Sequence, residues 1–173
     1  MIRKKRITAA ASALLWAGSF AAVSLPAVAA TAAERGTLVE RVRAANDRFK
    51  DVAAAVSEGY TPIPCASGVD GGAMGFHYVN AKLLGAESVD IAHPQAVMYQ
   101  PAADGKMDRI AVEYITGKGP ASLEGQLFSF VGAPNRDGLG PFYQLHVWAW
   151  KANPRGAFAD MNPNVSCAHA GAH

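Results

Sequence analysis

The 173-residue sequence is poor in charge and almost without cysteine. Charged residues make up 17% of it, apolar residues make up 50%, and only two cysteines are present. This balance is typical of a globular protein and excludes an intrinsically disordered chain. The sequence also lacks a P-loop, a G-x-G-x-x-G turn after a strand, an H-E-x-x-H helix and a G-x-S-x-G elbow, so these enzyme signatures are excluded.

Basic residues are concentrated at the start of the chain, where four of the 16 lie within the first six positions. Residues 7–25 follow without a charged side chain, Pro26 then breaks a helix, and residues 27–29 (Ala-Val-Ala) are small at the positions that a signal peptidase reads. This order predicts a secretory signal peptide over residues 1–29 and a secreted or periplasmic protein. A retained membrane anchor is the alternative, because the apolar run approaches the about 20 residues that cross a bilayer.

Cleavage after Ala29 is expected to leave residues 30–173 as a single domain with a flexible tail from about residue 168. The signal carries four of the 16 basic residues and no acidic residue, which leaves 12 Lys and Arg against 14 Asp and Glu, a net charge of −2. No two Lys or Arg residues are adjacent in this part of the chain. We therefore expect neither nucleic acid nor, after cleavage, a membrane as a partner.

Cys65 and Cys167 are the only cysteines. In an exported chain an isolated pair is most simply a disulfide, which here would close a loop of about 100 residues and stabilise the fold by up to ~4.7 kcal/mol in the chain-entropy model. The alternative is that both thiolates bind copper or zinc, although they lack C-x-x-C spacing.

The first part of the expected domain has the pattern of one long amphipathic helix. Thr37 and Glu40 have the spacing of a capping box, and Gly59 supplies a stop signal. Between them, apolar residues recur at steps of three and four positions. These apolar residues are Leu38, Val42, Ala45, Phe49, Val52 and Val56.

The remainder of the chain predicts strands separated by Gly, Pro, Asn and Asp turns, with one short helix at residues 80–86. The expected strands cover residues 96–100, 109–115, 126–131 and 142–150. Together these elements predict an α+β fold, in which one long amphipathic N-terminal helix packs on a four- to five-stranded antiparallel sheet and one disulfide closes the domain. A cystatin-like or cone-shaped two-layer arrangement fits this pattern.

Two segments are unusual in composition: residues 65–80, which read C-A-S-G-V-D-G-G-A-M-G-F-H-Y-V-N, and residues 142–167, which contain the L-H-V-W-A-W strand and an N-P…F-A-D…N-P…S-C tail. In these segments the sequence resembles a group of uncharacterised exported bacterial proteins. The resemblance covers most of the expected domain. The resemblance implies export, and it implies no activity, cofactor or functional residue.

Candidate chemistry lies on the last strand. Its period of two places His146 on one face with Gln144 and Trp148. One helix covers only one face of a sheet, so the other face either packs under the long loops or lines a pocket. His146 is then either a core histidine that is hydrogen-bonded to the backbone or part of a site.

Glu113 interrupts an otherwise apolar strand, and His77 ends the glycine-rich segment. If Glu113 and His146 share the pocket face, a carboxylate and two imidazoles converge there, and such donors hold Zn²⁺ or Cu²⁺. Met74 would add a soft ligand that suits copper, although a lone methionine is more often core filler. Gln144, Trp148, Tyr114 and Asp70 are the expected pocket residues.

Three functions from different classes follow. The first is a small exported binding protein that holds copper or zinc through His77 and His146, with Glu113 and Met74 as further ligands. The second is a small enzyme or small-molecule binder with a pocket between helix and sheet, in which His146 and Glu113 or Asp70 act as acid and base. The third is a structural or envelope interaction protein, which we would prefer if the two histidines lay more than about 10 Å apart.

Overall fold

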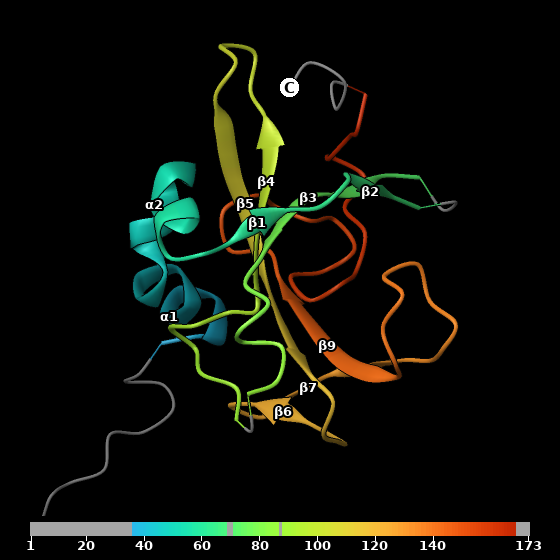
Figure 1. Cartoon of the computed structure of the whole chain (residues 1–173). Helices are drawn as coiled ribbons and strands as arrows, with labels where there is room; N and C mark the ends of the chain where they lie inside the picture. Colours follow the sequence, from blue (N-terminus) through green and yellow to red (C-terminus); the bar gives the residue numbers. More distant parts are fainter. Residues whose placement is uncertain (1–35, 69–70, 87, 169–173) are drawn as a thin grey trace, which may run out of the picture. The chain divides into compact units, whose positions relative to one another are not determined.

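The computed structural model describes residues 36–68, 71–86 and 88–168 (Figure 1). The predicted signal peptide with its cleavage site, Asp70, and the predicted tail after residue 168 lie outside the described residues. None of the helices in the described part of the chain has the length and apolar character needed to span a bilayer.

The N-terminal helical region is broken into three short pieces. These are α1 (Leu38–Ala45), a 3-10 turn (Asp47–Lys50) and α2 (Val52–Ser57). The capping box predicted at Thr37 and Glu40 is present. The prediction of a single long amphipathic helix is therefore wrong, although the predicted start of the helix is correct.

Polar side chains within the apolar pattern cause this break. The amide nitrogen of Asn46 donates to the carbonyl oxygens of Val42 and Ile91, which ends α1. Asp51 then caps α2 by accepting from the backbone N–H of Ala53. The break changes the direction in which the later residues point: Val56, expected on the buried stripe, is 54% exposed.

The main element is an antiparallel sheet of seven strands in the order β1-β3-β4-β5-β9-β8, with β2 also paired to β3 (Figure 1). A separate hairpin consists of β6 (Ser122–Leu123) and β7 (Gln126–Leu127). The strands of the main sheet are β1 (Thr61–Pro62), β2 (Ala66–Ser67), β3 (Ala73–Val79), β4 (Ala96–Pro101), β5 (Met107–Thr116), β8 (Ser129–Val131) and β9 (Phe142–Val147).

The predicted fold class is therefore wrong, because the molecule is mainly an antiparallel sheet with short helices and not a long helix on a four- to five-stranded sheet. The expected strands at 96–100, 109–115 and 142–150 correspond to β4, β5 and β9. The expected strand at 126–131 divides into β7 and β8, and residues 81–85 form turns in place of the expected short helix. The longest strand that the sequence pattern does not predict is β3, because its glycine-rich sequence is typical of a loop.

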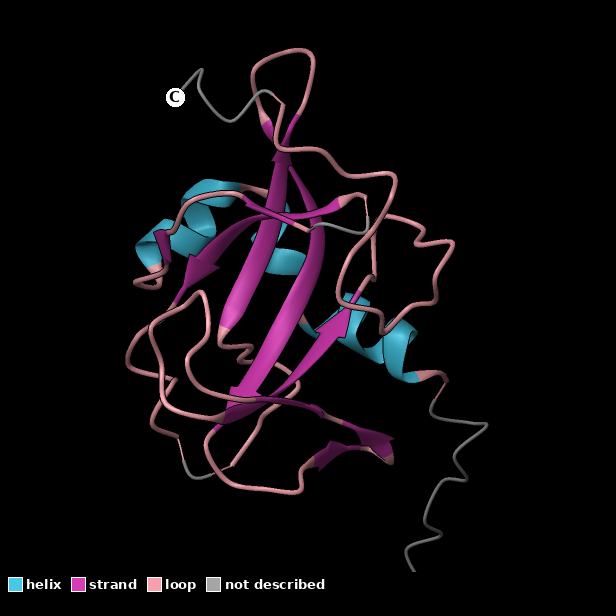
Figure 2. Ribbon diagram, turned by 90° about the vertical axis from the view of Figure 1, so that its right-hand side faces the viewer, coloured by secondary structure: helices cyan, strands magenta, loops and turns pink. Residues whose placement is uncertain are grey.

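The two faces of the sheet are covered differently. Helices α1 and α2 lie on one side, and the segment that follows β9 lies on the other (Figure 1). In the perpendicular view the helices stand behind the strands and the long loops cross in front of them (Figure 2). The core under the helices includes Phe49, Tyr60, Val97, Tyr99, Val112, Tyr114, Leu145 and Val147.

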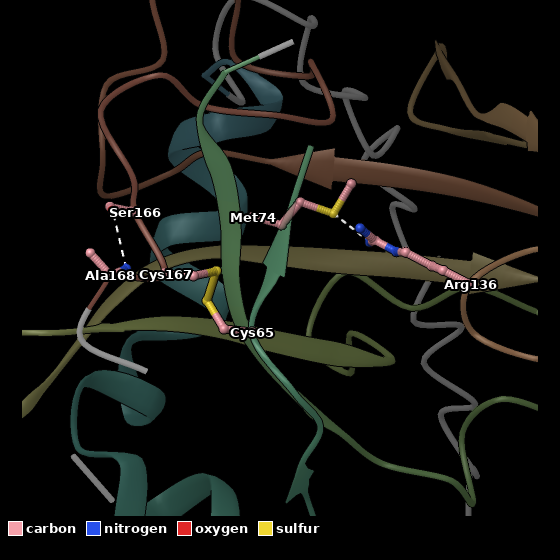
Figure 3. Close-up of a disulfide and its surroundings, with 6 residues drawn as sticks. All are labelled: Cys65, Met74, Arg136, Ser166, Cys167 and Ala168. Atoms are coloured by element: carbon pink, nitrogen blue, oxygen red, sulfur yellow. Dashed lines mark hydrogen bonds between the residues drawn. A yellow bond between two sulfur atoms is a disulfide. The ribbon is translucent and has the colours of Figure 1, made fainter. Parts of the chain in front are cut away.

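The second face is closed by the C-terminal segment. Ala73 in β3 pairs with Asn162, and a Cβ on Gly72 would lie only 2.4 Å from the Asn162 carbonyl oxygen, so this close approach requires glycine. The predicted Cys65–Cys167 disulfide is present, spans 102 positions and anchors the end of this segment beside β2 (Figure 3). The apolar residues buried on this side are Ala73, Met74, Met98, Ile110, Ala111, Trp148 and Val165.

Candidate metal centre

Three buried polar side chains meet on the sheet face that the helices do not cover. His77 comes from β3, Glu113 from β5 and His146 from β9. Glu113 pairs directly with His146 across β5 and β9, while Met98 in β4 separates His77 from β5. Because side chains alternate along a strand, this register turns all three toward the same side.

The geometry of the group is compatible with a metal ion. His77 Nε2 lies 3.5 Å from Glu113 Oε2, and His146 Nε2 lies 3.7 Å from Glu113 Oε1. One ligand atom from each residue lies within 4.8 Å of the other two, and the imidazole ring centres are 6.0 Å apart. Bonds of about 2.0–2.1 Å to a tetrahedral zinc ion place neighbouring ligand atoms about 3.4 Å apart. The three side chains therefore form a group that can hold a metal ion.

These side chains are buried without the hydrogen bonds that buried polar groups normally make. Relative exposures are 4% for His77, 6% for Glu113 and 1% for His146. Nδ1 of His77 and both ring nitrogens of His146 have no well-aligned hydrogen-bond partner within the described protein. Each such atom costs about 1–3 kcal/mol when left unpaired. The interpretation of His146 as a core histidine bonded to the backbone is thus not supported.

Asp160 lies on the outer side of His146. Its Oδ1 is 3.3 Å from His146 Nδ1, outside hydrogen-bond alignment, and accepts a hydrogen bond of 3.2 Å from the Gln144 amide. A carboxylate at the far nitrogen of a histidine orients that ring and raises its basicity as a ligand. The sequence alone favours Asp160 as a turn residue, because nothing in its spacing relates it to His146.

Burial and neighbouring charges assign different protonation states to the two histidines. Burial, together with the charges of His146 and Arg136, lowers the pKa of His77 to about 3, so this ring is neutral at pH 7. Burial also works to lower the pKa of His146, but the carboxylates of Glu113 and Asp160 outweigh it and raise that pKa.

The two carboxyl groups also differ. Burial raises the pKa of Glu113, whereas the adjacent His146 ring lowers the pKa of Asp160. Without an ion, any proton on the group at pH 7 is therefore held by the Glu113–His146 pair and not by His77. Metal binding would displace that proton.

A cavity of about 460 Å³ adjoins the group. His77 and Glu113 line it, and His146 does not. Because these two side chains are on the face away from the helices, this cavity is not the pocket that was expected between helix and sheet. The other lining residues are Ile63, Pro64, Cys65, Ala66, Val79, Leu84, Ile115, Arg136, Asp137, Leu139 and Phe142.

Met74, the fourth predicted ligand, contacts the guanidinium group of Arg136. Arg136 Nη2 lies 2.7 Å from the Met74 sulfur, and Figure 3 shows the two side chains pointing toward each other. Gly75, with φ +86°, interrupts the alternation of β3 and allows Met74 to join the apolar cluster on the His77 side. The sulfur is thus engaged by Arg136.

The predicted pocket residues lie in different places. Gln144 contacts Asp160, and the indole N–H of Trp148 donates to the Ala159 carbonyl oxygen at 2.6 Å. Tyr114 is not in the pocket: it lies on the helix side, where its hydroxyl donates to Ile91. Its position next to Glu113 along β5 turns it to the opposite face.

Comparison with known proteins adds no relative. The sequence matches no family model and no curated protein, and the structure matches no solved structure. Inference about function therefore depends on the geometry of the His77–Glu113–His146 group and the cavity beside it.

Proposed function

We propose that this chain is an exported protein that binds one divalent transition metal ion, zinc or copper, through His77, Glu113 and His146. The observation that carries the proposal is the convergence of two imidazoles and a carboxylate from three strands, all buried, with Nδ1 of His77 and both ring nitrogens of His146 left without a hydrogen-bond partner in the described part of the chain. Leaving three such groups buried without an ion is costly. A bound cation would provide a partner for the ligand nitrogens and for the carboxylate at once.

The donor set favours zinc or copper(II) over softer ions. Two imidazole nitrogens and one carboxylate oxygen suit Zn²⁺ and Cu²⁺, while copper(I) prefers sulfur. We leave Met74 out of the proposed ligand set because Arg136 donates to its sulfur. Asp160 is then the outer carboxylate that orients His146.

Export is the second part of the proposal. The order of basic, apolar and small residues in positions 1–29 supports it, as does the resemblance of residues 65–80 and 142–167 to exported bacterial proteins. The Cys65–Cys167 disulfide is also typical of oxidising compartments.

The interaction-protein alternative loses its main argument. It was to be preferred if the histidines were more than about 10 Å apart, but their ring centres are 6.0 Å apart. The small-molecule alternative gains one observation, the cavity beside His77 and Glu113.

Equilibrium dialysis of tag-free protein against Zn²⁺ and Cu²⁺ tests the proposal. We expect one ion per chain, and His77→Gln or Glu113→Gln should weaken binding by at least the about 10- to 100-fold that loss of an outer-shell partner costs. His93→Gln is the matched control, because His93 is exposed and pairs with Asp90.

The tail histidines need a separate control. A variant with His169 and His173 changed to glutamine removes opportunistic binding there. Circular dichroism verifies that each variant is folded. The proposal is wrong if the parent binds no ion, or if the His77 and His93 variants bind equally.

A further inference from the structure

The cavity beside the proposed metal centre combines a polar floor with apolar walls. Its volume of about 460 Å³ lies within the range of small-molecule sites. Ile63 and Leu139 line it although both are 38% exposed, which places apolar side chains at its accessible part. The other apolar side chains of the wall include Val79, Leu84, Ile115 and Phe142.

A metal ion at the centre would face this cavity on one side only. His77 and Glu113 line the cavity, whereas His146 is fully buried and does not. A zinc site with three protein ligands keeps its fourth position for water or another molecule. That position would therefore open toward the cavity.

Arg136 adds a positive charge to the same wall. Its Nη2 donates to the Met74 sulfur, a weak acceptor, and its Nε lies 3.5 Å from Asp137 Oδ1. The Arg136 side chain is 44% exposed and acts electrostatically on His77 and Glu113. Guanidinium groups recognise carboxylates through paired N–H donors.

Building on the proposed metal centre, we propose that this cavity binds a small organic carboxylate with a hydrocarbon chain. The carboxylate occupies the open position of the metal and accepts from Arg136, and the chain packs against Ile63, Leu139 and the apolar wall. Amines are disfavoured because the metal and Arg136 are both positive, and the Asp137 carboxylate in the same wall is already paired with Arg136. Alcohols lack the charge that both groups attract.

The test uses full-length, tag-free protein loaded with Cu²⁺, whose visible and electron paramagnetic resonance spectra report a change of ligands. Metal content is measured first. Acetate, butyrate and hexanoate are then titrated, with hexanol and hexylamine as matched probes. We expect the spectrum to change with the carboxylates only, and affinity to rise about fourfold for each methylene that becomes buried.

Two variants separate the contributions. Leu139→Ser should reduce the chain-length dependence, with Leu127→Ser as its control because Leu127 is exposed and outside the cavity. Arg136→Gln should weaken hexanoate binding about tenfold, in line with loss of a charged hydrogen bond. Arg41 forms an ion pair with Glu124 outside the cavity, so Arg41→Gln should leave hexanoate affinity unchanged.

The outcomes distinguish the two proposals. If no metal binds, both fail, and this is known before a carboxylate is added. If the metal binds but the spectrum ignores hexanoate, only the carboxylate site is wrong. Equal affinity for acetate and hexanoate, or an equal response to hexylamine, also overturns it, because either result would exclude recognition by apolar walls and Arg136.

Discussion

The two faces of the sheet bury polar atoms in opposite ways. On the helix side, the hydroxyls of Tyr60, Tyr99 and Tyr114 each donate to a backbone carbonyl oxygen at 2.7–2.8 Å. On the other side, His77, Glu113 and His146 contact one another, and Nδ1 of His77 and both ring nitrogens of His146 have no well-aligned hydrogen bond to the protein that the structure describes. The helix side leaves Asn46 Oδ1 and Arg109 Nε without a partner but gathers no group of metal ligands among the described residues, whereas the second face brings two imidazoles and a carboxylate together.

The elements that cover the two faces of the sheet also differ. Short helices pack on the tyrosine face, whereas loops and the disulfide-anchored C-terminal segment cover the histidine face. Loops more often carry binding residues. The C-terminal segment supplies Asp160, and the loop before β9 supplies Arg136. Substitutions on the tyrosine face should thus change stability, and those on the histidine face should change ion binding.

The largest expected effect is on the tyrosine face. Tyr99→Ala should lower the free energy of unfolding by about 3–5 kcal/mol, because Tyr99 is fully buried and its ring fills the core under the helices. Leu127→Ala, at an apolar residue that is 70% exposed, should stay within about 0.5 kcal/mol of the parent. Urea denaturation measures both. Similar losses for the two variants would contradict the assignment of the core.

The next effect concerns metal affinity. Asp160→Asn removes the charge beside His146 Nδ1 while nearly keeping the shape of the side chain, so we expect Zn²⁺ affinity to fall about 10- to 100-fold. Asp108→Asn, at an exposed carboxylate of β5, should not change it. Competition with a chromophoric chelator measures the constants. Unchanged affinity in Asp160→Asn would mean that Asp160 is only a turn residue.

Per pH unit, the smallest effect is the pH dependence of the stability of the metal-free protein. The unfolded chain protonates His77 below its ordinary pKa of 6.5, but burial keeps the folded ring neutral down to about pH 3. Stability due to His77 is therefore present above pH 6.5 and is lost as the pH falls through this window, by up to about 1.4 kcal/mol per pH unit. His77→Gln should remove this slope.

Urea denaturation with a chelator between about pH 4 and pH 6 measures that difference. Glu113 titrates in both proteins, so the comparison with the parent isolates His77. The raised pKa of His146 gives stability that is lost as the pH rises, above this window. His93→Gln is the control, because its side chain is 57% exposed. Equal slopes for parent and His77→Gln would contradict burial of a neutral His77.

Local patterns predicted the strands better than the helix. Residues 109–115 and 142–150 have β-branched and aromatic residues between turn signals, and their antiparallel pairing brings Glu113 opposite His146. The apolar stripe at residues 38–56 indicated one helix, but Asn46 reaches the carbonyl of Ile91, a distant contact that the sequence pattern does not contain. Tertiary contacts of this kind override periodicity.

The candidate site was predictable in part. His77, Glu113 and His146 were identified as polar residues within apolar or unusual segments, and alternation along the strands brings them to one face. The same alternation excludes Tyr114 from that face, so its assignment to the pocket contradicted the pattern. Asp160 and Arg136 lie in loops whose paths depend on the Ala73–Asn162 bridge and the disulfide, and no local pattern places them.

The most direct test of the central claim is diffraction at the zinc absorption edge from crystals of tag-free protein loaded with Zn²⁺. We predict one anomalous peak on the sheet face away from the helices. It should lie within about 2.0–2.2 Å of Nε2 of His77, Nε2 of His146 and a carboxylate oxygen of Glu113. A zinc peak bound elsewhere, with these three side chains unoccupied, would contradict the account.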